Sequence, residues 1–231
     1  MRDRFSEPLL ITGLPRSGTS LVAGILGQLG LWLGTTVPGG PANPKGFFEH
    51  IGLREQANKR ILARLGCDPL GVRKLPLLSN LPRVDRFREH IKNLLDADHY
   101  DDISPWGFKD AKLTLLWPVW RDAFPEAQWL VVHRPRELVI RSCLKTHFMR
   151  QHSGKIEFWE NFCDEYDCRL YALRKAVPST MQIDASRLID GDYDLLINVV
   201  ERMGLTWNTD RVTAFIDPAF WGDRHTGTAQ V

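Results

Sequence analysis

The stretch that most constrains the fold of this chain is LLITGLPRSGTSLVAGIL, from Leu9 to Leu26. It joins a short apolar segment, a loop bounded by Gly13 and Gly18, and a second apolar segment with helical spacing. A buried strand, a glycine-bounded loop and a helix in this order form a phosphate-binding loop, because the N–H groups of the loop gather at the positive end of the helix. The stretch therefore predicts an α/β fold with an anion site beside this helix.

This loop lacks the lysine of loops that bind nucleoside triphosphates. Their pattern is G-x-x-x-x-G-K-[ST], whereas this loop reads GLPRSGTS and has Thr19 at the lysine position. The lysine ammonium bridges the terminal phosphates of ATP or GTP, so its loss argues against that chemistry. The residues expected to bind the anion are Pro15, Arg16, Ser17, Gly18, Thr19 and Ser20.

Strand and helix patterns alternate along the rest of the chain. Strands are predicted at 9–12, 106–109, 129–133 and 180–184, with 31–34 as a candidate fifth strand. Helices are predicted at 18–29, 52–65, 82–96, 113–123, 136–150, 156–176 and 193–203. This alternation predicts a single domain over residues 1–231 with a three-layer, P-loop-type fold. Its centre would be a mostly parallel sheet of about four to five strands, with helices on both faces.

Composition narrows the function classes. The chain has 231 residues with 30 basic and 28 acidic side chains, a net charge of +2, so nucleic acid is not an expected partner. Its four cysteines form no C-x-x-C pair and no cluster with zinc spacing, which predicts no metal site and a reduced, cytoplasmic protein. No apolar run approaches the length of a membrane helix, so membrane insertion is not expected.

A second anion handle follows the strand predicted at 129–133. Arg134 comes directly after this strand, and Ser142 lies eight residues later, about two turns into the next predicted helix. A guanidinium group binds phosphate through two parallel hydrogen bonds, and a serine hydroxyl adds a neutral donor. Both side chains can therefore meet one ligand. Taken alone, Arg134 could equally cap a helix or pair with a carboxylate while Ser142 packs.

With both handles in view, the chain resembles the sulfotransferases that use 3′-phosphoadenosine 5′-phosphosulfate (PAPS). GLPRSGTS is similar to the 5′-phosphosulfate loop of that family in its P-R-S-G-T form. Arg134 and Ser142 match the family's 3′-phosphate motif. The resemblance implies that PAPS is the donor, bound by these two motifs.

Three further segments resemble the family less closely. NPKGFFEH at 43–50 is similar to an N-P-x-G-[FY]-[FW]-E segment of bacterial members. GFKDAK at 107–112 is similar to their G-x-K-D-P-R, but Ala111 and Lys112 replace the proline and the arginine. FIDPAFWGDRHTG at 215–227 resembles a family ending without the R-K-G triplet of many cytosolic members.

The resemblance also implies a reaction. A sulfuryl group would move from PAPS to a hydroxyl or amine of a small-molecule, carbohydrate or lipid acceptor, and adenosine 3′,5′-bisphosphate (PAP) would be released without a metal. Cations must stabilise the charge that develops, and Arg16 and Lys109 are the candidates because each stands at the carboxyl end of a strand. Ordinary surface ion pairing is the alternative role for both.

The base that takes the acceptor's proton is expected at Glu49, with His50 as its rival. Glu49 matches the family's loop glutamate, and the apolar Phe47 and Phe48 beside it are expected to raise its pKa. The ordinary pKa of histidine suits a base, and cytosolic family members commonly use one. Glu49 and His50 could instead cap the helix that begins near Ile51.

Two other functions stay open on the sequence alone. One is a P-loop small-molecule kinase or NTPase with a degenerate loop, since Asp110 follows a predicted strand. The other is a catalytically silent nucleotide-binding protein on the same fold. Residues 66–104 match no family segment, and acceptor recognition is expected there and in the loop at 34–48.

Overall fold

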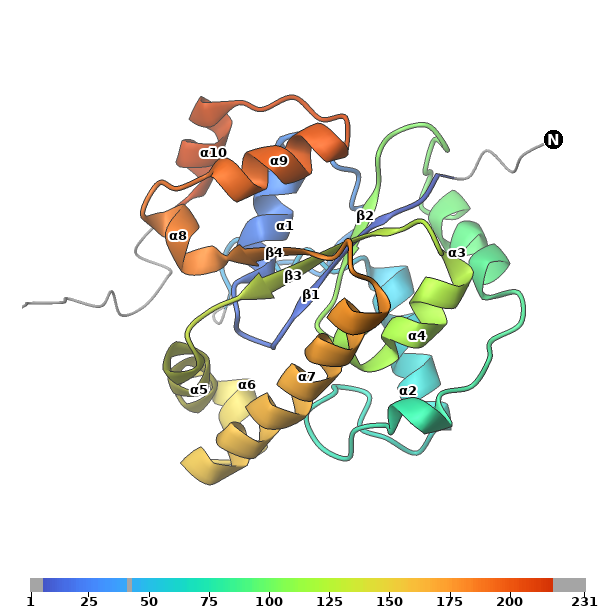
Figure 1. The fold of residues 1–231 in the computed structure, drawn as a ribbon, viewed down its shortest axis with the longest axis vertical. Coiled ribbons are helices and arrows are strands. Elements are labelled where there is room, and N and C mark those ends of the chain that lie inside the picture. Colours follow the sequence, from blue (N-terminus) through green and yellow to red (C-terminus); the bar gives the residue numbers. More distant parts are fainter. Residues whose placement is uncertain (1–5, 41–42, 218–231) are drawn as a thin grey trace, which may run out of the picture.

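The computed structural model describes residues 6–40 and 43–217, and their centre is a parallel sheet of four strands (Figure 1). The strands are β1 (Leu9–Gly13), β2 (Gly107–Lys109), β3 (Gln128–His133) and β4 (Met181–Asp184). They lie side by side in the order β2-β1-β3-β4, and every neighbouring pair is parallel. The carboxyl ends of β1, β2 and β3 therefore meet at one edge of the sheet, where such sheets bind ligands.

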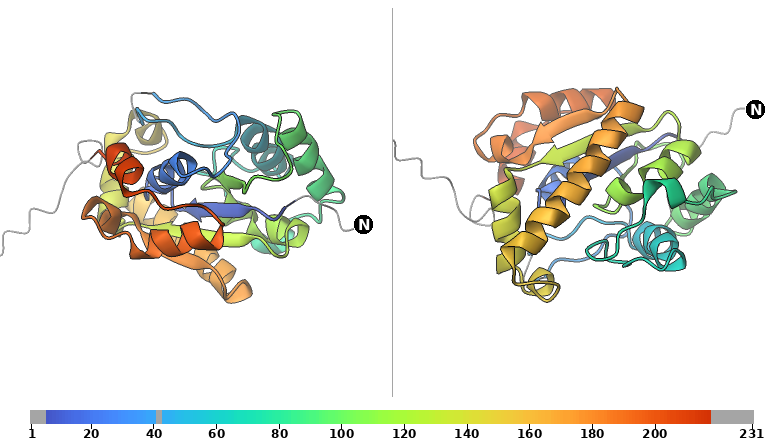
Figure 2. Two further views of the ribbon diagram at one scale, coloured as in Figure 1. Left: turned by 90° about the horizontal axis from the view of Figure 1, so that it is seen from above. Right: turned by 60° about the horizontal axis from the view of Figure 1, so that its bottom comes forward.

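Alternate residues of the strands face two separate cores. Leu9 and Ile11 pack into one core with α1 (Thr19–Gln28), α8 (Ala185–Ile189), α9 (Asp194–Arg202) and α10 (Thr209–Phe215). Leu10 packs into the other core with α3 (Phe87–Asp96), α4 (Leu113–Ala123), α5 (Arg136–Lys145) and α7 (Ile156–Ala176). The period of two along a strand produces this division. Figure 2 shows α7 lying across its face of the sheet, so the predicted three-layer fold is confirmed.

Short helical elements lie in the connections between the longer helices and the strands. The helix predicted at 52–65 begins as a π-helix, η1 (Leu53–Lys59), and continues as α2 (Arg60–Arg64). A short 3₁₀ turn, η2 (Leu78–Asn80), precedes α3, and α6 (His147–Arg150) follows α5. No helix in the described ranges 6–40 and 43–217 is long and apolar enough to cross a membrane.

Several predicted boundaries were wrong for local reasons. Residues 31–34 form no strand, because Trp32 alone makes a bridge to Trp106. The helix predicted to start at Pro82 begins only at Phe87, after Arg86 adopts a left-handed backbone with φ 57°. The helices α8 and α10 were not predicted at all.

The helix predicted at 136–150 is two helices. Thr146 separates α5 from α6 with an extended backbone, φ −79° and ψ 120°. Its backbone N–H and its hydroxyl both donate to the carbonyl of Ser142, at 3.0 and 2.7 Å. By contrast, the helices predicted at 113–123 and 156–176 have the observed bounds. Of the predicted C-terminal segment at 215–227, residues 218–227 lie outside the described residues.

Candidate active site

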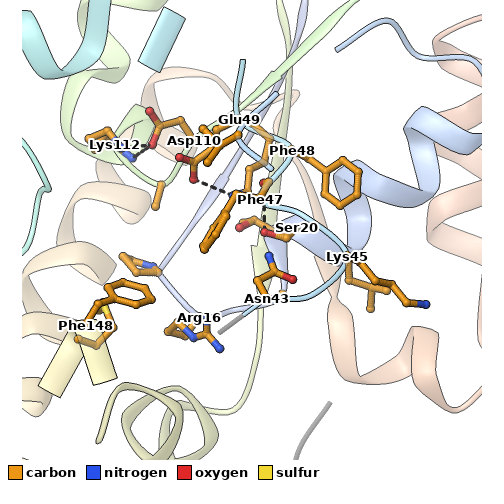
Figure 3. A pocket seen from close by; sticks show the side chains of 18 of the residues that line it. Arg16, Ser20, Asn43, Lys45, Phe47, Phe48, Glu49, Asp110, Lys112 and Phe148 are labelled. Atoms are coloured by element: carbon orange, nitrogen blue, oxygen red, sulfur yellow. Dashed lines mark hydrogen bonds and ion pairs between the residues drawn. The ribbon is translucent and has the colours of Figure 1, made fainter. Parts of the chain in front are cut away.

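A cavity of about 410 Å³ lies at the carboxyl edge of the sheet (Figure 3). The loop after β1 lines it, as do residues 109–112 after β2 and Arg134 after β3. Residues of the segment 43–49 also line the cavity, and Figure 3 shows Phe47 of this segment pointing into it. The residues predicted from the sequence to follow β1, β2 and β3 therefore line the same cavity.

The loop after β1 has the geometry of an anion cradle. Gly13 has φ 155°, and a Cβ atom there would lie 2.3 Å from the carbonyl oxygen of Val132, so only glycine fits. Gly18 precedes α1 in a left-handed conformation, φ 97°. The first N–H groups of α1 have no partner within the helix and lie at its positive end. Ser17 Oγ is buried and has no hydrogen-bond partner among the described residues.

The other loop residues connect the cradle to its surroundings. Pro15, Gly18 and Thr19 line the cavity, whereas Ser17 lies behind the lining. The hydroxyl of Ser20 also faces the cavity and donates to the carbonyl of Phe47 at 3.2 Å. The cradle is thus bonded to the segment that covers it.

Arg16 joins the two predicted anion handles. Its Nε donates to Oγ of Ser142 at 3.0 Å, and Nη1 of Arg134 donates to its backbone carbonyl at 3.4 Å. Burial lowers the pKa of Arg16, although Cys143 opposes that effect. The sequence proposed Arg16 for the transferred group, and here its guanidinium lies at the handle after β3. Arg16 and, more than a hundred positions later in the sequence, Arg134 and Ser142 therefore form one positively charged cluster, the cationic corner of the cavity.

On the β2 side, Glu49 is held between two cations. Its Oε1 accepts from Nζ of Lys109 at 2.9 Å, and its Oε2 lies 2.8 Å from Nε of Arg54. Burial raises the pKa of Glu49, but the charges of Lys109 and Lys112 outweigh it and hold the pKa at about 2. The prediction that Phe47 and Phe48 raise this pKa was wrong, because ionic neighbours dominate over apolar ones.

His50 faces away from the cavity. Its side chain is 3% exposed and is absent from the cavity lining. Nδ1 accepts the backbone N–H of Leu53 at 3.2 Å, and Nε2 lies 3.1 Å from Oδ2 of Asp98. Burial lowers the pKa of His50, although Asp98 opposes the shift. The ring therefore caps the helical turn that follows it.

A hairpin-like segment supplies Glu49 to the cavity. Thr36 forms an antiparallel bridge with His50, and the N–H of Val37 donates to the carbonyl of Glu49 at 2.9 Å. The N–H of Phe47 in turn donates to the carbonyl of Val37 at 3.1 Å. The glycine- and proline-rich stretch predicted as a loop is thus partly ordered by backbone pairing, which fixes the position of Glu49.

Behind Glu49 lies a buried polar network. Asp110 is fully buried; its Oδ2 accepts from Nδ2 of Asn58 at 2.9 Å, and its Oδ1 lies 2.8 Å from Nζ of Lys112. Oδ1 of Asn58 accepts from Nε1 of Trp120 at 2.8 Å. A buried charge is stable only when it is paired in this way. The network therefore fixes the β2 end of the site.

The sequence of this chain matches a known family. The family model described as "Sulfotransferase family" matches residues 8–203, which include every site residue described above. The chain belongs to the sulfotransferase family. A search of curated proteins by sequence gives no match for this sulfotransferase.

Solved structures share the fold of this sulfotransferase. Sulfotransferase STF1 from Mycobacterium tuberculosis H37Rv is 18% identical, with 95% of this chain and 74% of that chain covered and a TM-score of 0.51. The sulfotransferase domain of the olefin synthase of Synechococcus PCC 7002 is 17% identical, with 95% and 83% covered and a TM-score of 0.56. Sulfotransferase STF9 from Mycobacterium avium is 14% identical, with 91% and 67% covered and a TM-score of 0.55.

Among the site residues that sequence reasoning about this sulfotransferase missed are two from η1. Arg54 and Asn58 come from η1 and reach Glu49 and Asp110 respectively. The signal for Asn58 was an amide at a buried position of an otherwise apolar helical face, which requires a polar partner. In the described part of the chain, no group of three or more His, Cys, Asp or Glu side chains is placed to hold a metal ion.

Proposed function

We propose that this sulfotransferase uses PAPS as its donor, transfers the sulfuryl group to a hydroxyl or amine of a small-molecule acceptor, and releases PAP. The observation that carries the proposal is the contact of Arg16 with Ser142 at 3.0 Å. It brings the loop after β1 and the handle after β3 into one cationic corner. A nucleotide with phosphates at both its 5′ and 3′ positions would engage both, whereas ATP would leave the second empty.

The strand order supports one orientation of the donor. The 3′-phosphate would lie at Arg134 and Ser142 after β3, and the 5′-phosphosulfate at the loop after β1, next to the start of α1. The sulfuryl group then faces β2, where Lys109 and Glu49 lie. Burial of these charges would strengthen their action on the reacting group.

In the proposed reaction, the acceptor oxygen or nitrogen forms a bond to sulfur while the bond from sulfur to the 5′-phosphate oxygen breaks. PAP leaves with the bonding electron pair, and the acceptor's proton passes to the carboxylate of Glu49. Lys109 stabilises the charge on the sulfuryl oxygens. As the donor shares the charge of Lys109, the pKa of Glu49 rises toward its ordinary value and the carboxylate becomes a better base.

The placement of the two candidate bases favours Glu49. Glu49 lines the cavity and contacts Lys109, whereas His50 is buried outside the lining and uses Nδ1 to cap a helical turn. A base must lie within hydrogen-bond reach of the proton that it accepts. We therefore assign His50 a structural role.

Thermal unfolding with nucleotides tests the donor assignment. At a hundredfold excess over its dissociation constant, PAP without magnesium is expected to stabilise the protein by about 2.7 kcal/mol. That corresponds to a Tm increase of roughly 5–10 °C for a chain of this size. ATP with magnesium is expected to shift Tm little. The reverse order of the two nucleotides would support a kinase or NTPase instead.

A variant of Ser142 tests the proposed 3′-phosphate site separately. Ser142→Ala is expected to weaken PAP about tenfold, because it removes a hydrogen bond to a charged phosphate. Adenosine 5′-phosphosulfate lacks the 3′-phosphate, so its affinity is expected to change by less than about twofold. Equal losses for both nucleotides would contradict the role of Ser142.

A further inference from the structure

One wall of the cavity is apolar although much of it is open to solvent. Leu70 and Phe148 line the cavity with 47% and 40% of their surface exposed, and Val72 and Met149 lie buried beside them. His152 is the one titratable residue among the described cavity-lining residues of the segments 66–73 and 147–152. The rest of the lining carries the charges that the donor needs. Large apolar side chains that remain exposed inside a pocket indicate a place for an apolar ligand.

This wall is rigidly built. The carboxylate of Asp68 accepts the backbone N–H groups of Leu70 at 2.9 Å and Val72 at 3.1 Å. The hydroxyl of Tyr166 donates to the carbonyl of Gly71 at 2.8 Å. A side chain of α7 thus anchors the segment 66–73 from below. An ordered wall holds its apolar side chains in place before a ligand arrives, which lowers the entropy cost of binding.

Side-chain contacts join the two segments of the wall, 66–73 and 147–152. The guanidinium of Arg73 donates to the carbonyl of His152 and stacks over the ring of Phe158, 5.6 Å from its centre. These contacts join the segment 66–73 to the chain that follows α6. Figure 3 shows Phe148 across the cavity from Glu49.

The position of the wall places it on the acceptor side. A Cβ atom on Gly71 would lie 3.2 Å from Cγ of Lys112, so the segment 66–73 packs against the residues after β2. The handle after β3 lies on the opposite side of β1. A donor bound between β1 and β3 leaves the β2 side open for the molecule that attacks its sulfuryl group. A compound packed on the wall would therefore face Glu49 and Lys109 across the cavity.

From this placement we infer that the acceptor is an uncharged hydroxyl compound with an apolar body, which packs on Leu70, Val72, Phe148 and Met149. Its hydroxyl group would reach Glu49, which takes the proton, and its carbon skeleton would remain on the wall. This inference rests on the proposed function and names its substrate class. Sugars would bury their hydroxyl groups against carbon without partners, at a cost that alcohols with one polar group avoid.

An acceptor comparison with wall variants tests this inference. With PAPS as donor, 2-naphthol and 1-octanol are expected to be sulfated with at least tenfold higher kcat/KM than D-glucose. Leu70→Ser and Phe148→Ser are each expected to raise KM for 2-naphthol on the order of tenfold. Their affinity for PAP is expected to stay within about twofold of the wild-type value, which shows that the variants are folded. Leu195→Ser is the matched control, because Leu195 is also 47% exposed but lies on α9 away from the cavity lining.

The outcomes separate this inference from the proposed donor. Binding of PAP together with preferred sulfation of D-glucose would overturn the apolar acceptor and leave the donor assignment standing. Equal KM values for Leu70→Ser, Phe148→Ser and Leu195→Ser would also overturn it. Failure of PAP to bind the wild-type protein would overturn the donor assignment and this inference together.

Discussion

The carboxylate of Glu49 forms ion pairs with cations and is also the proposed base. It pairs with Lys109 at 2.9 Å and lies close to Arg54, and these charges keep it ionised. A carboxylate with a pKa of about 2 is available as a base at every physiological pH but is a weak one. In the proposed reaction the donor would compete for Lys109. Binding of the negatively charged donor would thus prepare Glu49 as the base.

Glu49→Gln is predicted to lower kcat by about 10²- to 10⁴-fold, because the amide cannot accept the acceptor's proton. PAP affinity is expected to fall by less than about threefold, since Glu49 does not face the phosphate handles. Steady-state kinetics and PAP titration measure both. Glu55→Gln is the control, because Glu55 also pairs with Arg54 but does not line the cavity. Near wild-type kcat in Glu49→Gln would remove Glu49 as the base.

The pH dependence follows from the same pKa. Because folding lowers the pKa of Glu49 from 4.5 to about 2, the ionised carboxylate stabilises the fold fully above pH 4.5. That contribution is lost as the pH falls from 4.5 toward 2. Glu49 therefore gives no acid limb to the activity profile of the free enzyme near neutral pH.

Site residues that directly follow a strand could be found from a local pattern, Glu49 and Ser142 from motifs that resemble the family, and the residues of the apolar wall not at all. Arg16, Lys109 and Arg134 stand where the chain leaves an apolar strand, which is a local pattern. Leu70 lies in a connection with no periodic signal and Phe148 lies in α6, and only tertiary packing brings the two together at the cavity. The pKa of Glu49 was mispredicted for a related reason, because Lys109 and Lys112, which lower it most, are distant from it in sequence.

At the scale of elements, His50 connects the hairpin-like segment to the helical stretch that begins η1. Its ring closes the first turn by accepting the N–H of Leu53, and its backbone pairs with Thr36. Because Nδ1 accepts a hydrogen bond, the neutral ring carries its proton on Nε2, next to Asp98. Protonation of Nδ1 would remove this acceptor and break the cap.

His50→Asn is predicted to make stability less dependent on pH. Burial lowers the pKa of His50 from 6.5, so the stability contributed by the neutral ring is complete above pH 6.5 and falls below it. In His50→Asn the amide oxygen can replace Nδ1 as acceptor but does not titrate. The gap in unfolding free energy between the wild type and this variant should shrink between pH 7.5 and 5.5, by at most about 1.4 kcal/mol per pH unit.

Urea unfolding at several pH values measures this gap. His50→Gln is the matched control, because its amide reaches the Nε2 position and leaves the N–H of Leu53 without a cap. It should be less stable than His50→Asn at pH 7.5 by about 1 kcal/mol. Parallel stability curves for the wild type and His50→Asn would show that His50 does not act as this cap.

Element boundaries were predicted well where the signal was local. The helices at 113–123 and 156–176 carry an apolar spacing over three or more turns, and their bounds were correct. The boundary at Phe87 depends on the left-handed backbone of Arg86, which no residue pattern indicates. The break at Thr146 lies in its extended backbone, which the helical pattern does not indicate.

At the scale of the whole molecule, one polar network connects the core to the site. Trp120 is fully buried in the core beneath the sheet, and it reaches Asp110 through Asn58. Asp110 in turn fixes Lys112, which helps to lower the pKa of Glu49. The ionic end of the cavity therefore depends on packing far from the reacting atoms.

Asp110→Ala is predicted to destabilise the fold by about 3–5 kcal/mol, because it leaves the ammonium of Lys112 buried without its partner. Urea unfolding measures the loss. Asp96→Ala breaks the exposed pair with Lys92 and is expected to cost less than about 1 kcal/mol. Equal losses in the two variants would show that the Asp110 network is not the connection described here.

The proposed donor-binding residues and the apolar wall lie in different parts of the structure. The donor-binding residues follow the carboxyl ends of β1 and β3, whose register is fixed by the sheet. The wall belongs to the connections 66–73 and 147–152, which form no part of the sheet. Mutations in these connections leave the strand register untouched. Under the proposed function, descendants of one ancestral gene can therefore diverge in the alcohols they modify while they inherit the same donor chemistry.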